Sequence, residues 1–249
     1  MRAPDYYDNM TPEEWKPILG DDLHYHFGFY ENGMTFEEGL RRAVRRLLPF
    51  LDNGPRVLDI GCGWGGPARE LAASGYDVCC VTNSERQLGY CRSLGLRTEL
   101  LDVEQDDLGG LGCFDSILMM ESLEHIFDKK RLLRALTGAA DRLVLVTNCS
   151  ALAVHEPLAA FGGTCLMMSA GTLVETLEDA GWHVRQATDV RARSMPTLGH
   201  WKSRIAATYP TGMKAAVRML QGLCDDALDN PQRFEAGFPL LTVAADRVD

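Results

Sequence analysis

The segment VLDIGCGWGG, residues 57–66, carries the clearest chemical signal in the sequence. An aliphatic run ends at Asp59, and Gly61 and Gly63 then open a loop that leads into a helix-forming stretch from about Gly65. Glycine permits positive φ and lets a ligand approach the backbone without a Cβ in the way, and the start of the helix presents unpaired N–H groups. Because doubly wound sheets bind ligands at the carboxyl ends of their strands, this spacing indicates a cofactor-binding loop.

A nicotinamide cofactor is one candidate ligand for this loop, because Gly66 falls where a dinucleotide fingerprint places its third glycine. Two observations favour a different ligand. Asp59 stands two residues before the first glycine, where its carboxylate can reach into the cleft. The second expected strand ends in VTNS, residues 81–84, without an acidic residue to hold the ribose of such a cofactor.

A second group of reactive side chains follows the later apolar runs. Glu121, Glu124 and His125 come after the run 114–120, and His155 comes after the next one. Their spacing within one helical turn lets Glu121 share a face with Glu124 or His125. A carboxylate or an imidazole beside a substrate can act as a general base, so we expect the catalytic group among these four residues. A structural role for His125 and an exposed loop position for His155 are the alternatives.

Short aliphatic runs alternate with helix-forming stretches from about residue 56 onward. A parallel sheet covered by helices on both faces produces this rhythm. The runs also lack strict alternation of apolar and polar residues, as strands buried on both sides do. The expected strands are residues 56–60, 77–81, 97–101, 114–120, 142–148, 183–190 and 239–248, and the expected helices are residues 66–74, 84–94, 129–139 and 171–181.

Two regions lie outside this alternation. The first contains a helix start at Thr11 and a long amphipathic helix over residues 36–51, and the second contains two further helices. We therefore predict an N-terminal helical lid, residues 1–52, followed by one α/β domain, residues 53–249. A helical cap is inserted into that domain at about residues 190–232.

The composition disfavours several classes of protein. The 249 residues carry 25 Lys and Arg against 35 Asp and Glu, a formal net charge of −10, and binding to nucleic acid needs a basic face. No apolar stretch approaches ~20 residues, so no membrane insertion is expected. The eight cysteines show no metal-ligand spacing, and a chain of this size needs no disulfides. We therefore expect a cytoplasmic protein with reduced thiols and no metal site.

The loop DIGCGWGG after an aliphatic strand resembles motif I of class I S-adenosylmethionine-dependent methyltransferases. The segment TNSERQ, residues 82–87, is similar to the T-x-S-x-x-Q of the cyclopropane fatty acid synthase-like branch of that superfamily. The resemblance extends over roughly residues 56–190 and includes LDVE at 101–104 and FDSILMMESLEHI at 114–126. It implies a Rossmann-like, doubly wound sheet of seven strands, mostly parallel with the last strand antiparallel, and S-adenosyl-L-methionine as the cofactor.

The resemblance also implies a set of cofactor contacts. Asp59 would support the amino group of the cofactor, and an aspartate after the third strand, Asp102, would meet the adenine amino group unless it only caps a turn. The aromatic segment HYHFGFY, residues 24–30, resembles a lid whose tyrosine rings can contact a sulfonium; core packing is the alternative. The implied cofactor-binding residues are Asp59, Gly61, Gly63, Thr82, Asn83, Gln87, Asp102, Val103, Glu121, Tyr25 and Tyr30.

The sequence departs from cyclopropane synthases, which hold a bicarbonate ion with four groups. Glu124 answers one of them, but no cysteine precedes Cys62, the run 142–148 has no histidine, and Ser194 stands where a tyrosine is expected. We therefore expect a methyltransferase that methylates an O, N or C atom of a small-molecule metabolite, with natural-product biosynthesis as one setting. A cyclase or cyclopropane synthase-like enzyme, a non-catalytic S-adenosylmethionine-binding protein and a homodimeric assembly stay open.

Overall fold

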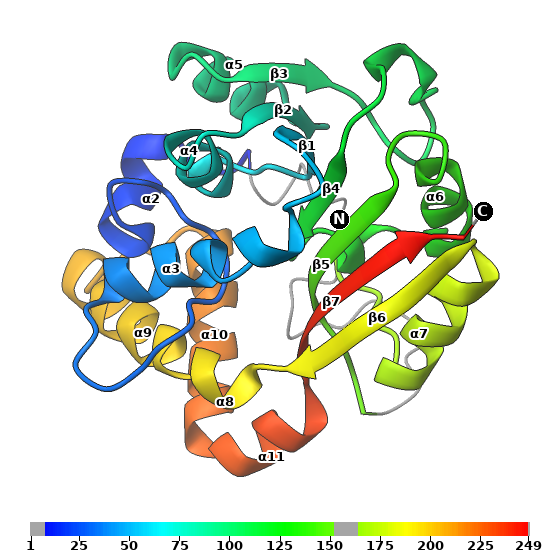
Figure 1. The fold of residues 1–249 in the computed structure, drawn as a ribbon. Helices are drawn as coiled ribbons and strands as arrows, with labels where there is room; N and C mark the ends of the chain where they lie inside the picture. The colour runs from blue at the N-terminus through cyan, green and yellow to red at the C-terminus, as the bar shows by residue number, and fades with distance from the viewer. Residues whose placement is uncertain (1–7, 152–163, 249) are drawn as a thin grey trace.

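The computed structural model describes residues 8–151 and 164–248. Seven strands of these residues form one sheet in the order β3-β2-β1-β4-β5-β7-β6 (Figure 1). Strands β1 to β5 pair in parallel, whereas β7 runs antiparallel to both β5 and β6. The predicted Rossmann-like sheet with an antiparallel last strand is confirmed. The strands are β1 (Arg56–Ile60), β2 (Asp77–Thr82), β3 (Arg97–Leu100), β4 (Ser116–Met120), β5 (Arg142–Asn148), β6 (Trp182–Asp189) and β7 (Leu240–Arg247).

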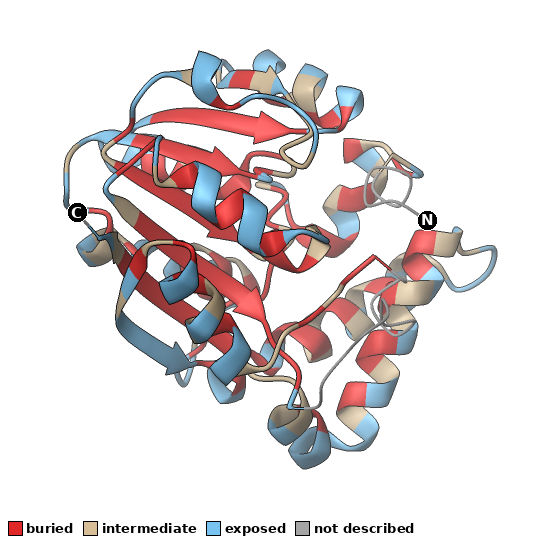
Figure 2. Ribbon diagram, turned by 90° about the vertical axis from the view of Figure 1, so that its right-hand side faces the viewer, coloured by how far each residue is buried: buried red, intermediate tan, exposed pale blue. Residues whose placement is uncertain are grey.

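Helices cover both faces of the sheet, and the central strands are buried between them (Figures 1 and 2). Consecutive residues of β1 enter separate hydrophobic clusters, Val57 on one face and Leu58 on the other. Because both faces are buried, these strands are apolar without alternation. The Val57 face is covered by α3 (Phe36–Arg45), α4 (Gly66–Ala73) and α5 (Glu85–Ser93), and the Leu58 face by α6 (Lys129–Leu136) and α7 (Ala170–Asp179).

A further group of helices packs beside the sheet and joins two distant parts of the chain (Figure 1). Helix α2 (Pro12–Leu19) begins at Thr11, which forms a capping box with Glu14. The fully buried Trp15 lies 5.0 Å from Tyr25 between ring centroids, and Tyr25 meets Trp201 edge-on at 5.9 Å. The N-terminal segment therefore packs directly on the cap insertion. The helices of that insertion are α8 (Arg191–Ser194), α9 (Pro196–Thr208), α10 (Ala215–Asp229) and α11 (Pro231–Gly237).

The long helix predicted for residues 36–51 is shorter in the structure. Helix α3 ends at Arg45, and a separate 3₁₀ turn follows over Leu48–Phe50. Pro49 explains the break, because proline lacks the N–H that an α-helix needs and its ring clashes with the preceding turn. The other 3₁₀ turns in the described residues span Gly109–Leu111 and Leu123–His125.

The sheet topology also determines where a ligand can bind. Strands β1, β2 and β4 are parallel neighbours, so their carboxyl ends lie at the same edge of the sheet. The strand order reverses between β1 and β4. Ligands of such sheets bind in the crevice outside the carboxyl ends at this reversal, so the loops after β1, β2 and β4 are positioned to form a site.

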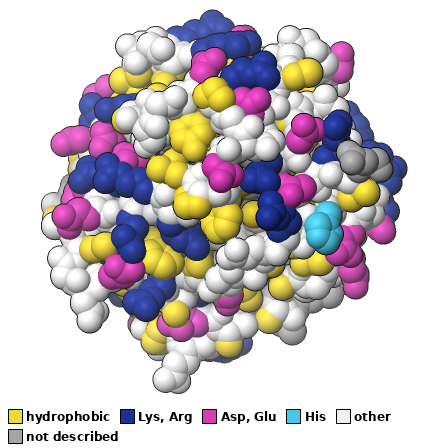
Figure 3. Space-filling model, viewed as in Figure 1, with side chains coloured by type: hydrophobic (Ala, Val, Ile, Leu, Met, Phe, Trp, Pro, Cys, Tyr) yellow, Lys and Arg dark blue, Asp and Glu magenta, His cyan; other side chains and the backbone are white. Residues whose placement is uncertain are grey.

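The surface mixes charges of both signs. Lys and Arg side chains are interspersed with Asp and Glu on the face shown in Figure 3. All eight cysteines are free thiols. No helix within residues 8–151 and 164–248 has the length and apolar character needed to cross a membrane.

Trp15→Ala should lower the free energy of unfolding by about 3–5 kcal/mol, because removal of a fully buried indole leaves a large cavity. Urea denaturation followed by circular dichroism measures the change. Leu94→Ala, at a side chain that is 38% exposed, is the control and should change the free energy by less than about 0.5 kcal/mol. An equally small effect of Trp15→Ala would show that the N-terminal segment adds little to the core.

Candidate functional site

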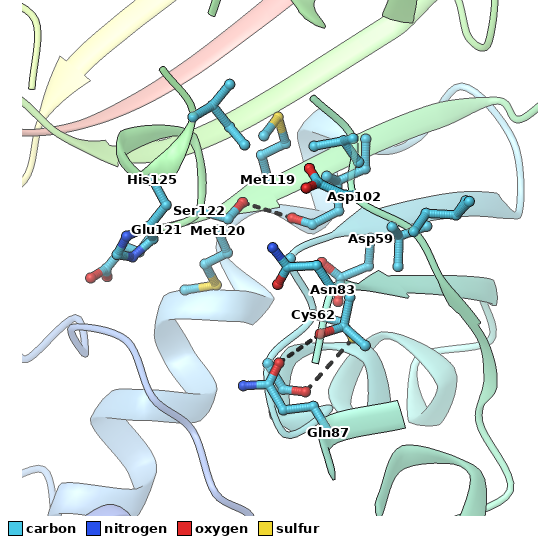
Figure 4. A pocket seen from close by; sticks show the side chains of 18 of the residues that line it. Asp59, Cys62, Asn83, Gln87, Asp102, Met119, Met120, Glu121, Ser122 and His125 are labelled. Atoms are coloured by element: carbon cyan, nitrogen blue, oxygen red, sulfur yellow. Dashed lines mark hydrogen bonds between the residues drawn. The ribbon is translucent and has the colours of Figure 1, made fainter. Parts of the chain in front are cut away.

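One cavity of about 540 Å³ opens at the carboxyl ends of the central strands (Figure 4). Its volume lies within the range of small-molecule and cofactor sites. Figure 4 shows Glu121 and His125 toward one end of this cavity and Asp102, Asn83 and Gln87 toward the other. Members of both groups of residues that the sequence singled out therefore border one shared space.

The predicted glycine loop lines this cavity between β1 and α4. Gly61 and Gly63 have φ values of +75° and +56°, which favour glycine. A Cβ at Gly61 would come within 2.4 Å of the Cβ of Ser122, whereas a Cβ at Gly63 would meet nothing within 4 Å. Both glycines line the cavity, and their contact with a cofactor stays a prediction. Gly61 is required by the close approach of Ser122, and Gly63 is the glycine that faces open space.

Asp59 presents a buried carboxyl group to the cavity near the end of β1. The residue is 1% exposed, and its Oδ2 has no hydrogen-bond partner among the described residues. Burial raises the pKa of Asp59 from 3.8 to about 7. Buried polar atoms in proteins are nearly always paired. An unpaired carboxyl oxygen at a cavity wall therefore fits a ligand that brings an N–H donor and a positive charge.

Polar side chains form the end of the cavity near β2 and β3. Thr82 Oγ1 donates a 2.7 Å hydrogen bond to Gln87 Oε1, which holds the two side chains together. Asp102 accepts hydrogen bonds from the backbone N–H of Glu104 at 3.1 Å and from Gln105 Nε2 at 2.6 Å. Asp102 thus caps a turn, as the alternative interpretation has it, and it also lines the cavity. The other predicted residues in this wall are Asn83 and Val103.

Glu121 lies in the opposite wall, where the chain leaves β4. Its φ of +53° is a left-handed conformation that is uncommon outside glycine. Glu121 Oε1 accepts a 2.7 Å hydrogen bond from the backbone N–H of Phe27, and Oε2 accepts a 3.4 Å bond from Asn148 Nδ2. Burial, and then the neighbouring Glu124, raise the pKa of Glu121 to about 8. Glu121 is therefore a carboxyl group that changes its charge near neutral pH.

The structure corrects the predicted helical turn over residues 121–125. The 3₁₀ turn begins only after Glu121, whose left-handed φ redirects the chain. Glu124 consequently points into the protein, where it accepts hydrogen bonds from Asn148 Nδ2 at 2.6 Å and from the Asn148 backbone N–H at 3.2 Å. Glu124 is 2% exposed and does not line the described cavity. Its surroundings are those of a structural residue and do not fit the catalytic role predicted for it.

His125 lines the cavity on the same side as Glu121. Its Nδ1 lies 3.2 Å from the backbone carbonyl of Thr164, so Nδ1 carries the hydrogen and donates it. Burial lowers the pKa of His125 below its ordinary value of 6.5. The imidazole is therefore neutral at physiological pH, with Nε2 as its acceptor. His155, the other predicted histidine, lies outside the described residues.

The N-terminal aromatic segment brings Tyr25 to the cavity but not Tyr30. Tyr30 is buried, stacks on His200 at 5.5 Å between ring centroids, and donates a 3.3 Å hydrogen bond to the carbonyl of Phe36. Its ring is held between α3 and α9. This position corrects the prediction that Tyr30 contacts the cofactor and supports the packing alternative for that residue.

A pair of buried histidines in the same segment was missed by the sequence reasoning. His26 lines the cavity, and its Nδ1 lies 3.0 Å from the carbonyl of Phe27. A carbonyl only accepts, so Nδ1 of His26 donates and its Nε2 accepts from His24 Nδ1 at 2.8 Å. Burial lowers the pKa of His26 to about 4, which keeps its ring neutral. The H-x-H spacing of His24 and His26 is the sequence signal that could have identified this pair.

Comparison with known proteins relates this geometry to a family. A family described as a methyltransferase domain matches residues 33–187, more than half of the chain. Methyltransferase GfsG of Streptomyces halstedii is 28% identical over 267 aligned positions, which cover 96% of this chain and 92% of that protein. Norajmaline N-methyltransferase of Rauvolfia serpentina is 28% identical over 158 positions, 55% of this chain, and the chain spans only 53% of that relative's length.

A solved structure supports the same conclusion for the fold. The mycolic acid cyclopropane synthase CmaA1, complexed with SAH and CTAB, aligns with a TM-score of 0.80 over 98% of this chain and 96% of that one, at 16% identity. The residues present also fit the cofactor, since buried Asp59 lacks a donor and Gly63 faces open space. The chain therefore belongs to the methyltransferase-domain family and is an S-adenosylmethionine-dependent methyltransferase.

Proposed function

We propose that S-adenosylmethionine binds in the cavity with its methionine part over the glycine loop. The unpaired Oδ2 of Asp59 supports this placement, because the ammonium group of the cofactor would supply the missing donor. The paired side chains of Thr82 and Gln87 would hold the ribose, and Asp102 would accept a hydrogen bond from the adenine amino group. When bound, the cofactor supplies a methyl group that its sulfonium makes electrophilic.

The acceptor that fits the other end of the cavity is a small molecule with an amine group. Among the described residues, the cavity lining contains acidic side chains and no Lys or Arg. A phosphate or carboxylate acceptor would meet the Glu121 carboxylate without a compensating cation, which is costly in a buried site. The relative from Rauvolfia serpentina is an N-methyltransferase by name, which supports an amine. The acidic lining residues are Asp59, Asp102, Glu104, Asp106 and Glu121.

An ammonium acceptor must lose a proton before its nitrogen can bond to a methyl carbon. Glu121 can take that proton, because each carboxylate oxygen has two acceptor positions and Phe27 and Asn148 occupy one on each oxygen. A pKa of about 8 places Glu121 near the pH at which a general base works best. Neutral His125 lines the same wall of the cavity. The products are the methylated ammonium ion, which carries the positive charge of the former sulfonium, S-adenosylhomocysteine and protonated Glu121, which returns its proton to solvent.

The N-terminal segment would exclude water from the end of the cavity at Glu121. Tyr25 and His26 line the cavity, and the backbone N–H of Phe27 is bonded to the Glu121 carboxylate. A dry site strengthens the electrostatic interactions within it. The position of Glu121, a half-buried carboxyl group with a raised pKa in the wall away from the adenosine end, is the observation on which the proposed function rests.

Amine-dependent conversion of S-adenosylmethionine to S-adenosylhomocysteine tests this function. Small primary and secondary amines are assayed beside carboxylic acids of the same carbon skeleton, with methylated products identified by mass spectrometry. We expect turnover with amines and none with the acids. Turnover of the acids alone, or a rearranged acceptor without release of S-adenosylhomocysteine, would contradict the proposal.

Gly63→Ala should weaken binding of S-adenosylhomocysteine at least ~10-fold, because its methyl group enters the open space beside the loop. Gly75→Ala is a matched control, since Gly75 also has positive φ, +94°, with nothing within 4 Å of an added Cβ, and lies in an exposed turn. Both variants should lose about 1–2 kcal/mol of stability from backbone strain. Isothermal titration calorimetry that finds equal affinities for the two variants would remove the loop from the binding site.

Asp59 should release a proton when S-adenosylhomocysteine binds at pH 6. Its pKa is about 7 in the free protein and should fall when an ammonium group pairs with it, so the complex holds one proton fewer between the two values. Calorimetry in buffers of different ionisation enthalpy measures this release, and affinity should rise with pH toward 7.

The variant Asp59→Asn should abolish the proton release and weaken binding by roughly 10- to 150-fold, the loss of one charge-assisted hydrogen bond of ~1.5–3 kcal/mol. Asp77→Asn alters an exposed carboxylate at the start of β2 and should leave both quantities unchanged. If Asp59→Asn still released a proton on binding, another group would be the partner of the ammonium.

Glu121→Gln should lower kcat for an amine acceptor by ~10²–10⁴, the usual contribution of a general base, with the affinity for S-adenosylhomocysteine nearly intact. Steady-state kinetics and calorimetry check the two halves of this expectation. Glu175→Gln, on the exposed side of α7, is the control and should keep kcat. A Glu121→Gln enzyme with normal kcat would show that the amine arrives already deprotonated.

A further inference from the structure

Arg191 is a buried guanidinium group that the steps above do not use. It is 1% exposed and lies at the start of α8, in the cap insertion. Its Nε donates to the carbonyl of Phe238 at 2.7 Å, its Nη1 donates to Ser194 Oγ at 3.2 Å, and its Nη2 donates to Asn148 Oδ1. Burial lowers its pKa only to about 10, so Arg191 keeps its charge at neutral pH. A buried charge of this kind needs a compensating partner.

Asn148 connects this charge to two glutamates, the buried Glu124 and the half-buried Glu121. Because a guanidinium only donates, Asn148 must turn Oδ1 toward Arg191. Its Nδ2 then faces the opposite way, where it donates to Glu124 Oε1 at 2.6 Å and to Glu121 Oε2 at 3.4 Å. A flipped amide would place its NH₂ group against the guanidinium and its oxygen against two carboxylates. Arg191 therefore determines that Asn148 turns its NH₂ group, and not its oxygen, toward Glu121.

A second contact leads from Arg191 to the other oxygen of Glu121. The guanidinium carbon lies 4.3 Å from the centroid of the Phe27 ring, a cation–π distance. The backbone N–H of the same Phe27 donates to Glu121 Oε1 at 2.7 Å. Through Asn148 on one side and Phe27 on the other, Arg191 contacts both residues that donate to the Glu121 carboxylate.

We propose that Arg191 is a positioning residue for the methyl transfer, which holds the Glu121 carboxylate toward the cavity through Asn148 and Phe27 and opposes its negative charge. The inference rests on the proposed role of Glu121 as the base. It explains why two acidic side chains can lie together under the site, since Glu124 alone would favour the uncharged form of Glu121. The cap insertion then contributes to catalysis through α8, without contact to the acceptor.

Charged and titratable groups from several elements surround Glu121 and all bear on its protonation. Glu124, in the turn after β4, raises the pKa of Glu121, and Arg191 lowers it. Loss of the guanidinium should therefore raise this pKa further. The groups that face Glu121 or line the same cavity wall are Glu124, Arg191, the Cys165 thiol, His26 and His125.

The test compares Arg191→Gln with Arg191→Lys in the cofactor-free protein. The titration of Glu121 is followed by ¹³C NMR of glutamate carboxyl carbons, with the signal assigned from the Glu121→Gln variant. Arg191→Gln should raise the apparent pKa by about one unit or more, the effect expected when a nearby opposite charge is removed. Arg191→Lys keeps the charge and should restore most of the shift. Arg193→Gln, an exposed arginine on the same helix, should change nothing.

Kinetics provide the second readout. In Arg191→Gln the lower limb of the kcat pH profile should move upward by the same amount as the NMR titration, with kcat recovering at high pH. If Arg191 had only a structural role, Arg191→Gln would lower kcat at every pH, and the lower limb of the pH profile would stay at the same pH. If Arg191→Gln does not fold, Asn148→Ser replaces it. Serine removes the hydrogen bond of Asn148 to Glu121 and leaves the guanidinium, so the pKa of Glu121 should still shift upward, but by less than in Arg191→Gln.

Two outcomes separate this inference from the proposed function. An unchanged or downward-shifted titration of Glu121 in a folded Arg191→Gln or Asn148→Ser protein would overturn the inference while leaving the general base in place. The proposed base would be overturned instead by a different pair of results. In that case the Glu121→Gln enzyme keeps its full kcat, while the single variant Arg191→Gln still shows the upward shift in the NMR titration of Glu121.

Discussion

The hydrogen bond from the backbone N–H of Phe27 to Glu121 Oε1 connects the parts of the protein that must act together. It joins the N-terminal segment to the carboxyl end of β4 over 2.7 Å, although 94 residues separate the two in sequence. Without it Glu121 would lose a hydrogen-bond donor that favours its charged form, and the Tyr25–Phe27 segment would lose its hydrogen bond to the residue that follows β4. The shape of the reactive end of the site thus depends on a contact between the sheet and a segment outside it.

Desolvation dominates the electrostatics of the site, and the hydrogen bond from Phe27 opposes it at Glu121. Desolvation raises the pKa values of two of the carboxyl groups that line the cavity, Asp59 to about 7 and Glu121 to about 8. The two differ in their partners, because Asp59 has an unpaired oxygen whereas Glu121 already accepts two hydrogen bonds. An unpaired buried carboxyl suits a permanent positive group of the cofactor. A carboxyl held by donors at both oxygens suits a group that must gain and lose a proton without moving.

Local sequence pattern was sufficient for the framework of the fold. The central strands are short apolar runs and the loop at Gly61 and Gly63 needs positive φ, so both are determined by residues that lie close together in sequence. The prediction for residues 121–125 failed because the left-handed backbone of Glu121 is imposed by its tertiary contacts and has no glycine to mark it. Glu124 lies three residues after Glu121, the spacing that predicts a shared helical face. Its carboxylate nevertheless accepts hydrogen bonds from Asn148 and does not reach the cavity.

Contacts between distant segments account for the remaining differences. Tyr30 belongs to the same aromatic segment as Tyr25, but only Tyr25 reaches the cavity. The ring of Tyr30 is held between α3 and α9 by contacts with Phe36 and His200. Arg191 had no visible motif, because its role depends on Asn148 and Phe27, which lie 43 and 164 positions away. Residues of this kind become recognisable only when the burial and hydrogen bonds of the folded chain are known.

The central claim is that Glu121 removes a proton from an amine acceptor, and the dependence of its contribution on acceptor basicity tests this most directly. The ratio of kcat in the unmodified enzyme to kcat in Glu121→Gln is measured at pH 7 for a series of related amines. For amines that are protonated at this pH the ratio should reach ~10²–10⁴, and for weakly basic, aniline-type amines that arrive neutral it should approach one. A ratio that stays the same across the series would contradict the assignment of Glu121 as the base.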